Sequence, residues 1–416
     1  MAPSKFDIVI YGATGFTGRL AVAYVAKQYP GKAIKWAVAG RSASKLETVA
    51  TNCDAECGII VAEADDEEAL AAMCRQTKVV IACAGPFARY GKKLVAACVA
   101  AGTDYCDITG ELSFVREMIA LHDDAARKSG SKIVHLCGHD SVPWDISTLM
   151  LAKQLVAEGG ADAKLKRVDF FTDIKSAPSG GTLETAMGIM FGAEGKAKPH
   201  PSVKALGYDP LLKKVDGAKS SFGTSAKNVA VLQMGAGKLS SNPLVKHRPH
   251  RTLFFMAGVN ANAVKRSNAL NGYGEKVVYC EGQSFASLFS AICYLLGLAW
   301  FGVCLAIPPI RAFLRAFVLP KPGDGPSPES MAKGYLVVTG VAQSTTGHKA
   351  TSVMRFPVDP GYVDTARMVV ESALTLALDE EKLEDKSGGV FTPGCCQKKA
   401  LLDRLCKTGT SFEICP

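Results

Sequence analysis

Apolar and polar positions in the first 140 residues alternate between two kinds of segment. Short runs with the length of strands lie at 6–11, 34–39, 58–63, 79–84, 103–107 and 133–137. The run at 6–11 is almost continuously apolar after Asp7, as in a central parallel strand that is covered on both faces. Longer stretches with helical periodicity lie at 19–28, 66–75, 90–101 and 112–129. This alternation predicts an α/β domain with a doubly wound parallel sheet.

The first of these strands runs directly into a glycine-rich turn, which a predicted helix follows. The turn consists of Gly12, Ala13, Thr14, Gly15, Phe16, Thr17 and Gly18. Gly12 permits a tight turn, Gly15 lets the backbone approach a pyrophosphate, and Gly18 lets the helix pack closely on the strand. Phosphates would bind the free N–H groups at the helix N-terminus. The pattern predicts a Rossmann dinucleotide site; the alternative is a glycine-rich turn without a ligand.

The residues after the second strand indicate which dinucleotide binds. An NAD-specific site has an acidic residue here that bonds the ribose hydroxyls, whereas this chain has Arg41, followed by Ser42 and Lys45. A guanidinium pairs with a 2′-phosphate, which a carboxylate would repel. The sequence therefore favours NADP(H) over NAD(H). The alternative is that Arg41 only caps or solvates the loop.

Two further strand ends supply candidate cofactor contacts. Asp65 follows the third strand and could face the adenine or cap the helix at 66–75. The small residues after the fourth strand would let the backbone pass close to the nicotinamide ribose. The predicted contacts there are Ala84, Gly85, Pro86 and Tyr90.

The second half of the chain predicts a further α/β domain with a mixed sheet. Strands are expected at 167–174, 252–256, 276–280 and 335–341, and helices at 146–157, 180–192, 360–378 and 397–406. The helix start at 180–182 could hold a carboxylate or phosphate, or could be a plain cap. The expected division is an NADP-binding domain at 1–145, a substrate or dimerisation domain at 146–283 and 321–395, an apolar insertion at 284–320 and a tail at 396–416.

The apolar insertion is the most unusual feature of the pattern. Residues 285–310 contain no charged side chain, and such a helix is long enough to cross a bilayer. A single crossing would separate the later strand and helix from their domain, and Pro308-Pro309 ends the helix. Arg311 and Arg315 then lie among apolar residues, as suits an interface. We expect a helical hairpin dipping into one leaflet or a lipid-droplet monolayer; the alternative is a helix pair buried in a homodimer.

Composition narrows the class of protein. A hydrophobic fraction of 48% with 21% charged residues is that of a globular chain. The net charge of +9 comes from scattered lysines without a nucleic-acid motif, so we expect no nucleic-acid partner. The 14 cysteines lie mostly in apolar stretches and lack zinc spacing, which indicates reduced thiols and no metal. The expected location is a cytosol-facing membrane surface: a lipid droplet, the endoplasmic reticulum or the mitochondrion.

Several motifs together resemble one family. They are the glycine turn, Ala39-Gly-Arg-Ser42, Ala84-Gly-Pro-Phe87, Tyr90-Gly91, Tyr105-Cys-Asp-Ile-Thr-Gly-Glu111, Cys137-Gly-His-Asp-Ser-Val-Pro143, Gly180-Gly-Thr182 and Gly389-Val-Phe-Thr-Pro393. This set resembles the saccharopine dehydrogenase-like oxidoreductases and is similar to bacterial trans-acting enoyl reductases, which act on lipid chains. The resemblance implies an NADP-type Rossmann domain and a second domain that closes over the cofactor. The family's usual Gly-Phe-Asp-Ser is here Gly138-His-Asp-Ser141.

Candidate proton donors lie near the predicted strand ends. They are Tyr105, Asp107, Glu111, His139 and Asp140. His139 can titrate near neutral pH, and the alternative is that it is a structural histidine. Asp140 and Ser141 could instead cap the following helix. No tyrosine is followed by lysine in a Tyr-xxx-Lys dyad, which disfavours a short-chain dehydrogenase. Two hypotheses result: an NADPH-dependent reductase of an apolar, lipid-derived substrate, and a catalytically silent nucleotide-binding scaffold at a lipid surface.

Overall fold

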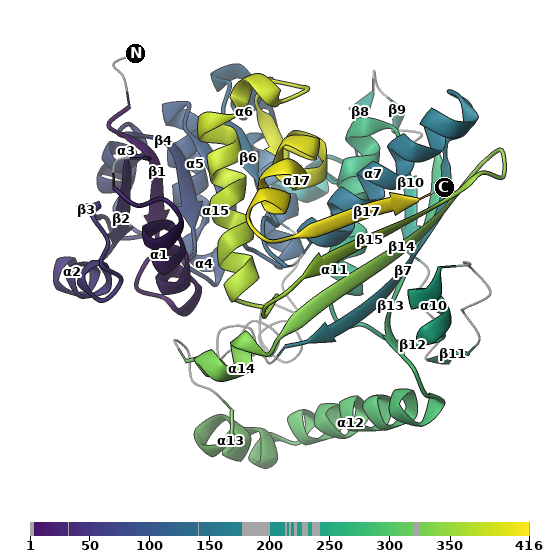
Figure 1. Ribbon diagram of the computed structural model, residues 1–416. Helices are drawn as coiled ribbons and strands as arrows, with labels where there is room; N and C mark the ends of the chain where they lie inside the picture. The colour runs from purple at the N-terminus through teal and green to yellow at the C-terminus, as the bar shows by residue number, and fades with distance from the viewer. Residues whose placement is uncertain are drawn as a thin grey trace.

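Two large β-sheets, each with its own helices, form the body of the protein (Figure 1). The computed structural model describes residues 4–31, 33–139, 141–176, 200–212, 214–215, 218–219, 223–226, 232–234, 242–319 and 324–415. The predicted helix at 180–192 and the candidate Asp140 lie outside the described residues.

The first sheet has seven parallel strands in the order β16-β6-β5-β4-β1-β2-β3. Its strands are β1 (Phe6–Tyr11), β2 (Trp36–Gly40), β3 (Gly58–Val61), β4 (Thr77–Ala82), β5 (Asp104–Asp107), β6 (Lys132–Val134) and β16 (Gly389–Phe391). The order reverses between β1 and β4, as in a Rossmann fold, and ligands of such sheets bind at the strand ends beside that point. The predicted doubly wound domain is confirmed.

Helices cover both faces of this sheet, so the side chains of its central strands β1, β2 and β4 are almost all buried. They are α1 (Phe16–Gln28), α2 (Ala43–Asn52), α3 (Glu67–Cys74), α4 (Phe87–Tyr90), α5 (Lys92–Ala101) and α6 (Leu112–Ser129). The helix α1 begins within the glycine turn, three residues before the predicted start. One covering helix comes from late in the chain: α15 (Val363–Leu378) packs against α1 and the strands β1, β4 and β5.

The second sheet is mixed and has eight strands. They are β7 (Leu165–Lys175), β10 (Gly223–Ala226), β11 (Leu232–Gln233), β12 (His250–Thr252), β13 (Lys276–Phe285), β14 (Tyr335–Ser344), β15 (Lys349–Phe356) and β17 (Ser411–Cys415). The order along the sheet is β11-β12-β13-β7-β14-β15-β17, with β10 pairing with β13. Parallel β7 and β13 adjoin antiparallel β14, β15 and β17, which confirms the predicted mixed sheet.

Helices α7 (Val142–Gly159), α11 (Ala257–Asn271) and α17 (Lys398–Lys407) contribute buried side chains to the core of the second sheet. Shorter elements complete the described chain: α9 (Pro201–Ala205), β8 (Lys214–Val215), β9 (Ala218–Lys219), α10 (Pro243–His247), α14 (Pro328–Ala332), η3 (Glu380–Lys382) and α16 (Pro393–Cys396). The sequence pattern does not predict α11, β15 or β17. It also groups residues 389–391 with the second domain, whereas β16 pairs with β6 of the first sheet.

A helical pair projects from the body at the bottom of Figure 1. Helix α12 (Leu288–Ala306) is followed at Pro308 by α13 (Pro308–Phe317). Among the described helices, α12 alone is long and apolar enough to cross a membrane, with a mean hydropathy of 2.1 over 18 residues. Only Ala291 and Leu305 of α12 are buried. The predicted apolar helical protrusion is therefore present, with its hydrophobic side chains facing outward.

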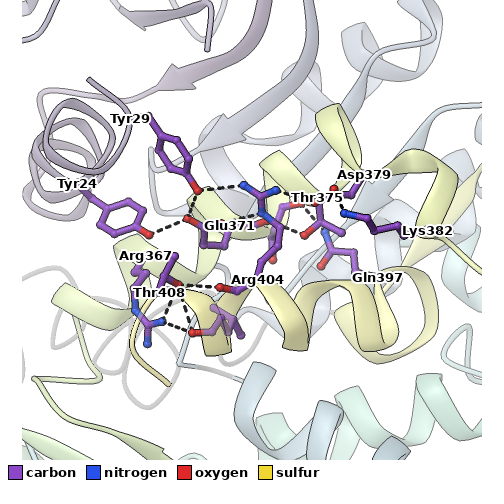
Figure 2. Close-up of polar contacts among 12 residues, drawn as sticks. Tyr24, Tyr29, Arg367, Glu371, Thr375, Asp379, Lys382, Gln397, Arg404 and Thr408 are labelled. Carbon is purple, nitrogen blue, oxygen red and sulfur yellow. Dashed lines mark hydrogen bonds and ion pairs between the residues drawn. The ribbon is translucent and has the colours of Figure 1, made fainter. Parts of the chain in front are cut away.

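A buried polar network ties the C-terminal helices to the first domain (Figure 2). Glu371 of α15 is 0% exposed and accepts hydrogen bonds of 2.7 Å from the hydroxyls of Tyr24 and Tyr29 on α1. The guanidinium of Arg404 on α17 donates to the same carboxylate at 2.7 Å and to Asp379 at 2.6 Å. The buried charge is thus paired and hydrogen-bonded, as burial requires. Through this network the end of the chain holds α1, and with it the glycine turn.

Candidate cofactor and active site

The glycine turn has the geometry of a backbone cradle. Gly12 adopts φ +81°, and a Cβ there would lie 2.8 Å from the backbone nitrogen of Ala84. At Gly18 a Cβ would lie 2.3 Å from the carbonyl oxygen of Gly12. Only glycine fits these two positions, as the sequence predicts for the turn and for helix packing. The residues present therefore fit a dinucleotide pyrophosphate.

The N-terminus of α1 offers backbone N–H groups to an anion. Its cap, Gly15, has no side chain that could occupy them, and the first turn carries no acidic residue. Thr14 and Thr17 are half-buried beside Gly15, whereas Ala13 is fully buried. The ring of Phe16 packs edge-on against Tyr362 at 5.2 Å between centroids. Phe16 therefore packs its side chain against the N-cap residue of α15 and offers a ligand only its backbone.

The end of β2 places two cations at the surface. Arg41 and Lys45 are exposed, and Ser42 is the N-cap of α2 with its Oγ 3.3 Å from that of Ser44. Arg41 follows directly after β2, next to the β1 end that carries the glycine turn. This is the position from which a guanidinium would reach a 2′-phosphate.

Asp65 does not cap the helix after β3. The cap is Asp66, whose carboxylate accepts a hydrogen bond of 2.9 Å from the backbone N–H of Ala69. The capping alternative for Asp65 is therefore wrong, because the helix begins one residue later than that alternative requires. Asp65 remains highly exposed, with its carboxylate 3.7 Å from the ammonium of Lys93.

The carboxylate of Glu111 anchors the loop after β4. Both oxygens of Glu111 accept hydrogen bonds of 2.8 Å, from the backbone N–H groups of Phe87 and Ala88. This fixes the turn that contains Ala84, Gly85, Pro86 and Tyr90, of which Gly85 is exposed and the other three are half-buried. Glu111, a candidate proton donor in the sequence, instead anchors the loop by accepting these bonds.

Tyr105 and Asp107 meet in a buried network with His135, which no sequence motif singles out. The carboxylate of Asp107 lies 2.7 Å from Nδ1 of His135 and accepts a hydrogen bond of 3.1 Å from the Tyr105 hydroxyl. All three side chains are fully buried, and burial raises the pKa of Tyr105 well above its ordinary value. Asp107 also accepts the backbone N–H groups of Thr109 and Leu136. This buried network holds the end of β5 against the residues that follow β6.

His139 lies in the turn between β6 and α7 and is 5% exposed. Burial lowers its pKa to about 3, so the ring is neutral at pH 7. The interpretation that His139 titrates near neutral pH is therefore wrong, because burial disfavours the charged form of its ring. Ser141 occupies the N-cap of α7 without making a side-chain cap bond.

The sequence comparisons agree with this architecture. The family model described as the saccharopine dehydrogenase NADP binding domain matches residues 8–134. A Mycobacterium tuberculosis protein with the provisional name trans-acting enoyl reductase is 36% identical over 430 residues, covering 99% of this chain and 98% of that protein. The trans-acting enoyl reductase of Mycobacterium ulcerans is 33% identical, covering 98% of this chain and 97% of its own.

Among solved structures, apo saccharopine dehydrogenase (L-Glu forming) from Saccharomyces cerevisiae has a TM-score of 0.49 and 14% identity, covering 99% of this chain and 100% of that chain. The curated relatives match over nearly their full length, so the likeness includes both domains. The chain belongs to the saccharopine dehydrogenase-like oxidoreductases that include the trans-acting enoyl reductases, and it is an NADP(H)-dependent enzyme.

Proposed function

We propose that this protein uses NADPH to reduce the carbon–carbon double bond of a lipid-derived α,β-unsaturated acyl group at a membrane surface. The observation that carries the proposal is the outward-facing helical pair α12–α13, in an enzyme whose relatives bear the name of enoyl reductases. An apolar substrate is held in or at a membrane, so an enzyme that acts on it benefits from being attached there.

The chemistry requires a hydride at one carbon and a proton at the other. When bound, NADPH supplies the hydride, which adds to the β-carbon and leaves NADP⁺. The α-carbon takes a proton from water, and the product is the saturated acyl group. In this proposal the glycine turn and the N-terminus of α1 hold the pyrophosphate, and Arg41 binds the 2′-phosphate. The loop anchored by Glu111 borders the nicotinamide end.

The helical pair is suited to lie in one leaflet. On α12, Phe289, Leu296 and Trp300 are 76%, 65% and 71% exposed, and they lie seven and four residues apart, on one helix face. On α13, Phe313 and Phe317 are 58% and 77% exposed. Contiguous exposed apolar surface of this kind marks an interaction site. Both β14 and α15, which follow the pair in the chain, belong to the body of the protein, so the chain enters and leaves the membrane on the same side.

The reaction is tested by measuring NADPH oxidation with a panel of enoyl thioesters, ketones and imines, in the presence of phospholipid vesicles. We expect turnover of long-chain enoyl thioesters and little turnover of the other classes. Cofactor binding without turnover of any compound would contradict the proposal and support the catalytically silent scaffold instead.

Membrane attachment is tested separately by vesicle flotation. We expect the full chain to float with vesicles and a protein lacking residues 284–320 to stay in solution. Equal flotation of both proteins would remove the helical pair as the anchor. The alternative is a homodimer interface. It would be favoured if the full chain forms a stable dimer in detergent-free solution and the protein lacking residues 284–320 is a monomer.

A further inference from the structure

The turn between β6 and α7 and the first turn of α7 contain buried polar atoms that have no hydrogen-bond partner among the described residues. They are both ring nitrogens of His139, the Oγ of Ser141 and the Nε1 of Trp144. These residues are 5%, 0% and 0% exposed. Proteins pair nearly all of their buried polar groups, because an unpaired one loses its hydration without compensation. The four unpaired atoms between residues 139 and 144 are therefore available to a polar group that binds there.

Backbone contacts hold the described residues on either side of position 140. The N–H of His139 donates to Oγ1 of Thr365 at 3.0 Å. A Cβ at Gly138 would lie 2.9 Å from Cγ2 of the same threonine. The N–H of Trp144 donates to the carbonyl oxygen of Ser141 at 3.2 Å in the first turn of α7. The side chains of His139 and Trp144 are therefore presented by backbone that is itself hydrogen-bonded, as a binding site requires.

The turn also lies at the carboxyl ends of the strands of the first sheet, which is where ligands of such sheets bind. It follows the carboxyl end of β6, which is three strands from β1 in the order β6-β5-β4-β1. At the usual spacing of neighbouring strands, this is roughly 14 Å from the glycine turn. An extended dinucleotide spans a distance of this order, from the pyrophosphate cradle to the reacting ring. The unpaired atoms thus lie where the nicotinamide end of the cofactor meets a substrate.

A row of aromatic rings connects this turn to the surface. The ring centroids of His139 and Trp144 are 5.2 Å apart, those of Trp144 and Phe254 are 5.6 Å apart, and those of Phe254 and Phe255 are 5.2 Å apart. Phe254 is buried, whereas Phe255 and Leu253 are 65% and 40% exposed. They follow β12, which contacts α12 (Figure 1). The row therefore leads from the interior to the side of the protein that carries the helical pair.

We propose that His139, Ser141 and Trp144 bind the carbonyl oxygen of a long-chain α,β-unsaturated acyl substrate, whose chain lies along Phe254 and Phe255 toward α12. The inference rests on the proposed function and names its substrate site. Hydride addition at the β-carbon moves negative charge onto the carbonyl oxygen, and the O–H and N–H groups of the turn donate hydrogen bonds to it. Donors that are already fixed in position stabilise such a charge strongly, because they need no reorganisation as it develops. Collapse of the enolate, with a proton from water at the α-carbon, completes the reduction.

The polar end of the site is tested with Trp144→Phe and Ser141→Ala. Each removes one donor and keeps the local shape, and we expect each to lower kcat for trans-2-hexadecenoyl-CoA by about 100-fold. The affinity for NADPH, measured by calorimetry, is expected to stay within about twofold of wild type, since the pyrophosphate and 2′-phosphate contacts lie elsewhere.

Two matched controls separate this role from general damage to the core. Trp36→Phe removes a buried indole from the first domain, and Ser372→Ala removes a buried hydroxyl of α15 that also lacks a partner. We expect both to keep wild-type kcat for the same thioester. If Trp144→Phe and Ser141→Ala lower kcat no more than these controls do, the unpaired atoms only hold structural water and the inference is wrong.

The apolar end is tested with Phe255→Ser, which changes an exposed side chain and so leaves the fold intact. We expect KM for trans-2-hexadecenoyl-CoA to rise about tenfold, with no change for trans-2-butenoyl-CoA, whose chain is too short to reach Phe255. Leu121→Ser, at a 43% exposed leucine of α6, is the control and should alter neither KM. An equal change in KM for both chain lengths would contradict the proposed path.

A binding measurement distinguishes failure of this inference from failure of the proposed function. Saturated hexadecanoyl-CoA cannot be reduced, and its binding is followed by calorimetry. Suppose that the wild type reduces no enoyl thioester but binds hexadecanoyl-CoA, and that Phe255→Ser weakens this binding. The acyl site is then supported and the proposed reaction is wrong. If wild type and Phe255→Ser bind it equally, the acyl path is wrong whatever the enzyme reduces.

Discussion

Polar substitution of one face of α12 should release the protein from membranes without unfolding it. We consider the triple variant Phe289→Ser, Leu296→Ser and Trp300→Ser. The three side chains are 76%, 65% and 71% exposed, so they contribute little to the packed core. Full burial of a large apolar side chain contributes about 1.5–3 kcal/mol, so the exposed parts of these three would contribute roughly 4 kcal/mol to insertion. The variant should therefore have a vesicle–water partition coefficient about 1000-fold lower than that of the wild type.

Flotation on a density gradient with phospholipid vesicles, across a range of lipid concentrations, measures this coefficient directly. Thermal unfolding of both proteins without lipid should give the same midpoint, because solvent-exposed side chains are being changed. The matched control is Ile59→Ser, Leu121→Ser and Leu378→Ser, at side chains that are 39%, 43% and 39% exposed on the body of the protein. This control should float like the wild type. Unchanged flotation of the α12 variant would refute the reasoning.

Three further predictions follow from the packing around the site. Gly18→Ala should abolish NADPH binding in calorimetry, because its Cβ would lie 2.3 Å from the carbonyl oxygen of Gly12. Arg404→Ala should lower the free energy of unfolding by about 3–5 kcal/mol in urea titrations, because it leaves Glu371 charged, fully buried and without its cation. Burial raises the pKa of Glu281 from 4.5 to about 8. The folded protein therefore keeps a proton that the unfolded chain releases above about pH 4.5, so this residue's contribution to stability should decline from pH 4.5 to about 8.

Each of these predictions has a control in the chain. Gly258→Ala, where a Cβ would meet nothing within 4 Å, should keep NADPH binding. Lys399→Ala breaks an exposed ion pair with Asp403 and should cost no more than about 1 kcal/mol. Glu281→Gln cannot titrate, so the difference in stability between wild type and variant should shrink toward low pH. A constant difference from pH 5 to 8 would contradict the raised pKa.

The first domain could be predicted from the sequence because its signals are local. Strand, glycine turn and helix are consecutive at 6–28, and the steric need for Gly12 and Gly18 acts between neighbouring elements. The apolar helical pair is equally local, since its length and lack of charge do not depend on partners. Such features follow from propensity and periodicity alone.

The remaining features depend on contacts between distant segments. Helix α11 has the sequence AGVNANAVKRSNALN and buries Asn260, Arg266 and Asn268, so polar residues occupy positions where an amphipathic pattern has apolar ones. The edge strand β17 and the late strand β16 are recognisable only by their partners β15 and β6.

The candidate site shows the same limit. A sequence can nominate His139, but its low pKa, and the pairing of His135 with Asp107, come from burial that only the folded structure supplies. The unpaired Trp144 has no signal in the sequence, because a tryptophan in the first turn of a buried helix is ordinary core composition.

The account depends most on the phosphate-binding geometry of the first domain, which calorimetric titration tests directly. NADPH and NADH are titrated into the full-length wild type and into Arg41→Ala. We expect the wild type to prefer NADPH and the variant to lose most of that preference through weaker NADPH binding, with NADH affinity changed less than about twofold. Equal losses for both nucleotides would contradict the assignment of Arg41 to the 2′-phosphate, and no binding of either to the wild type would contradict the whole account.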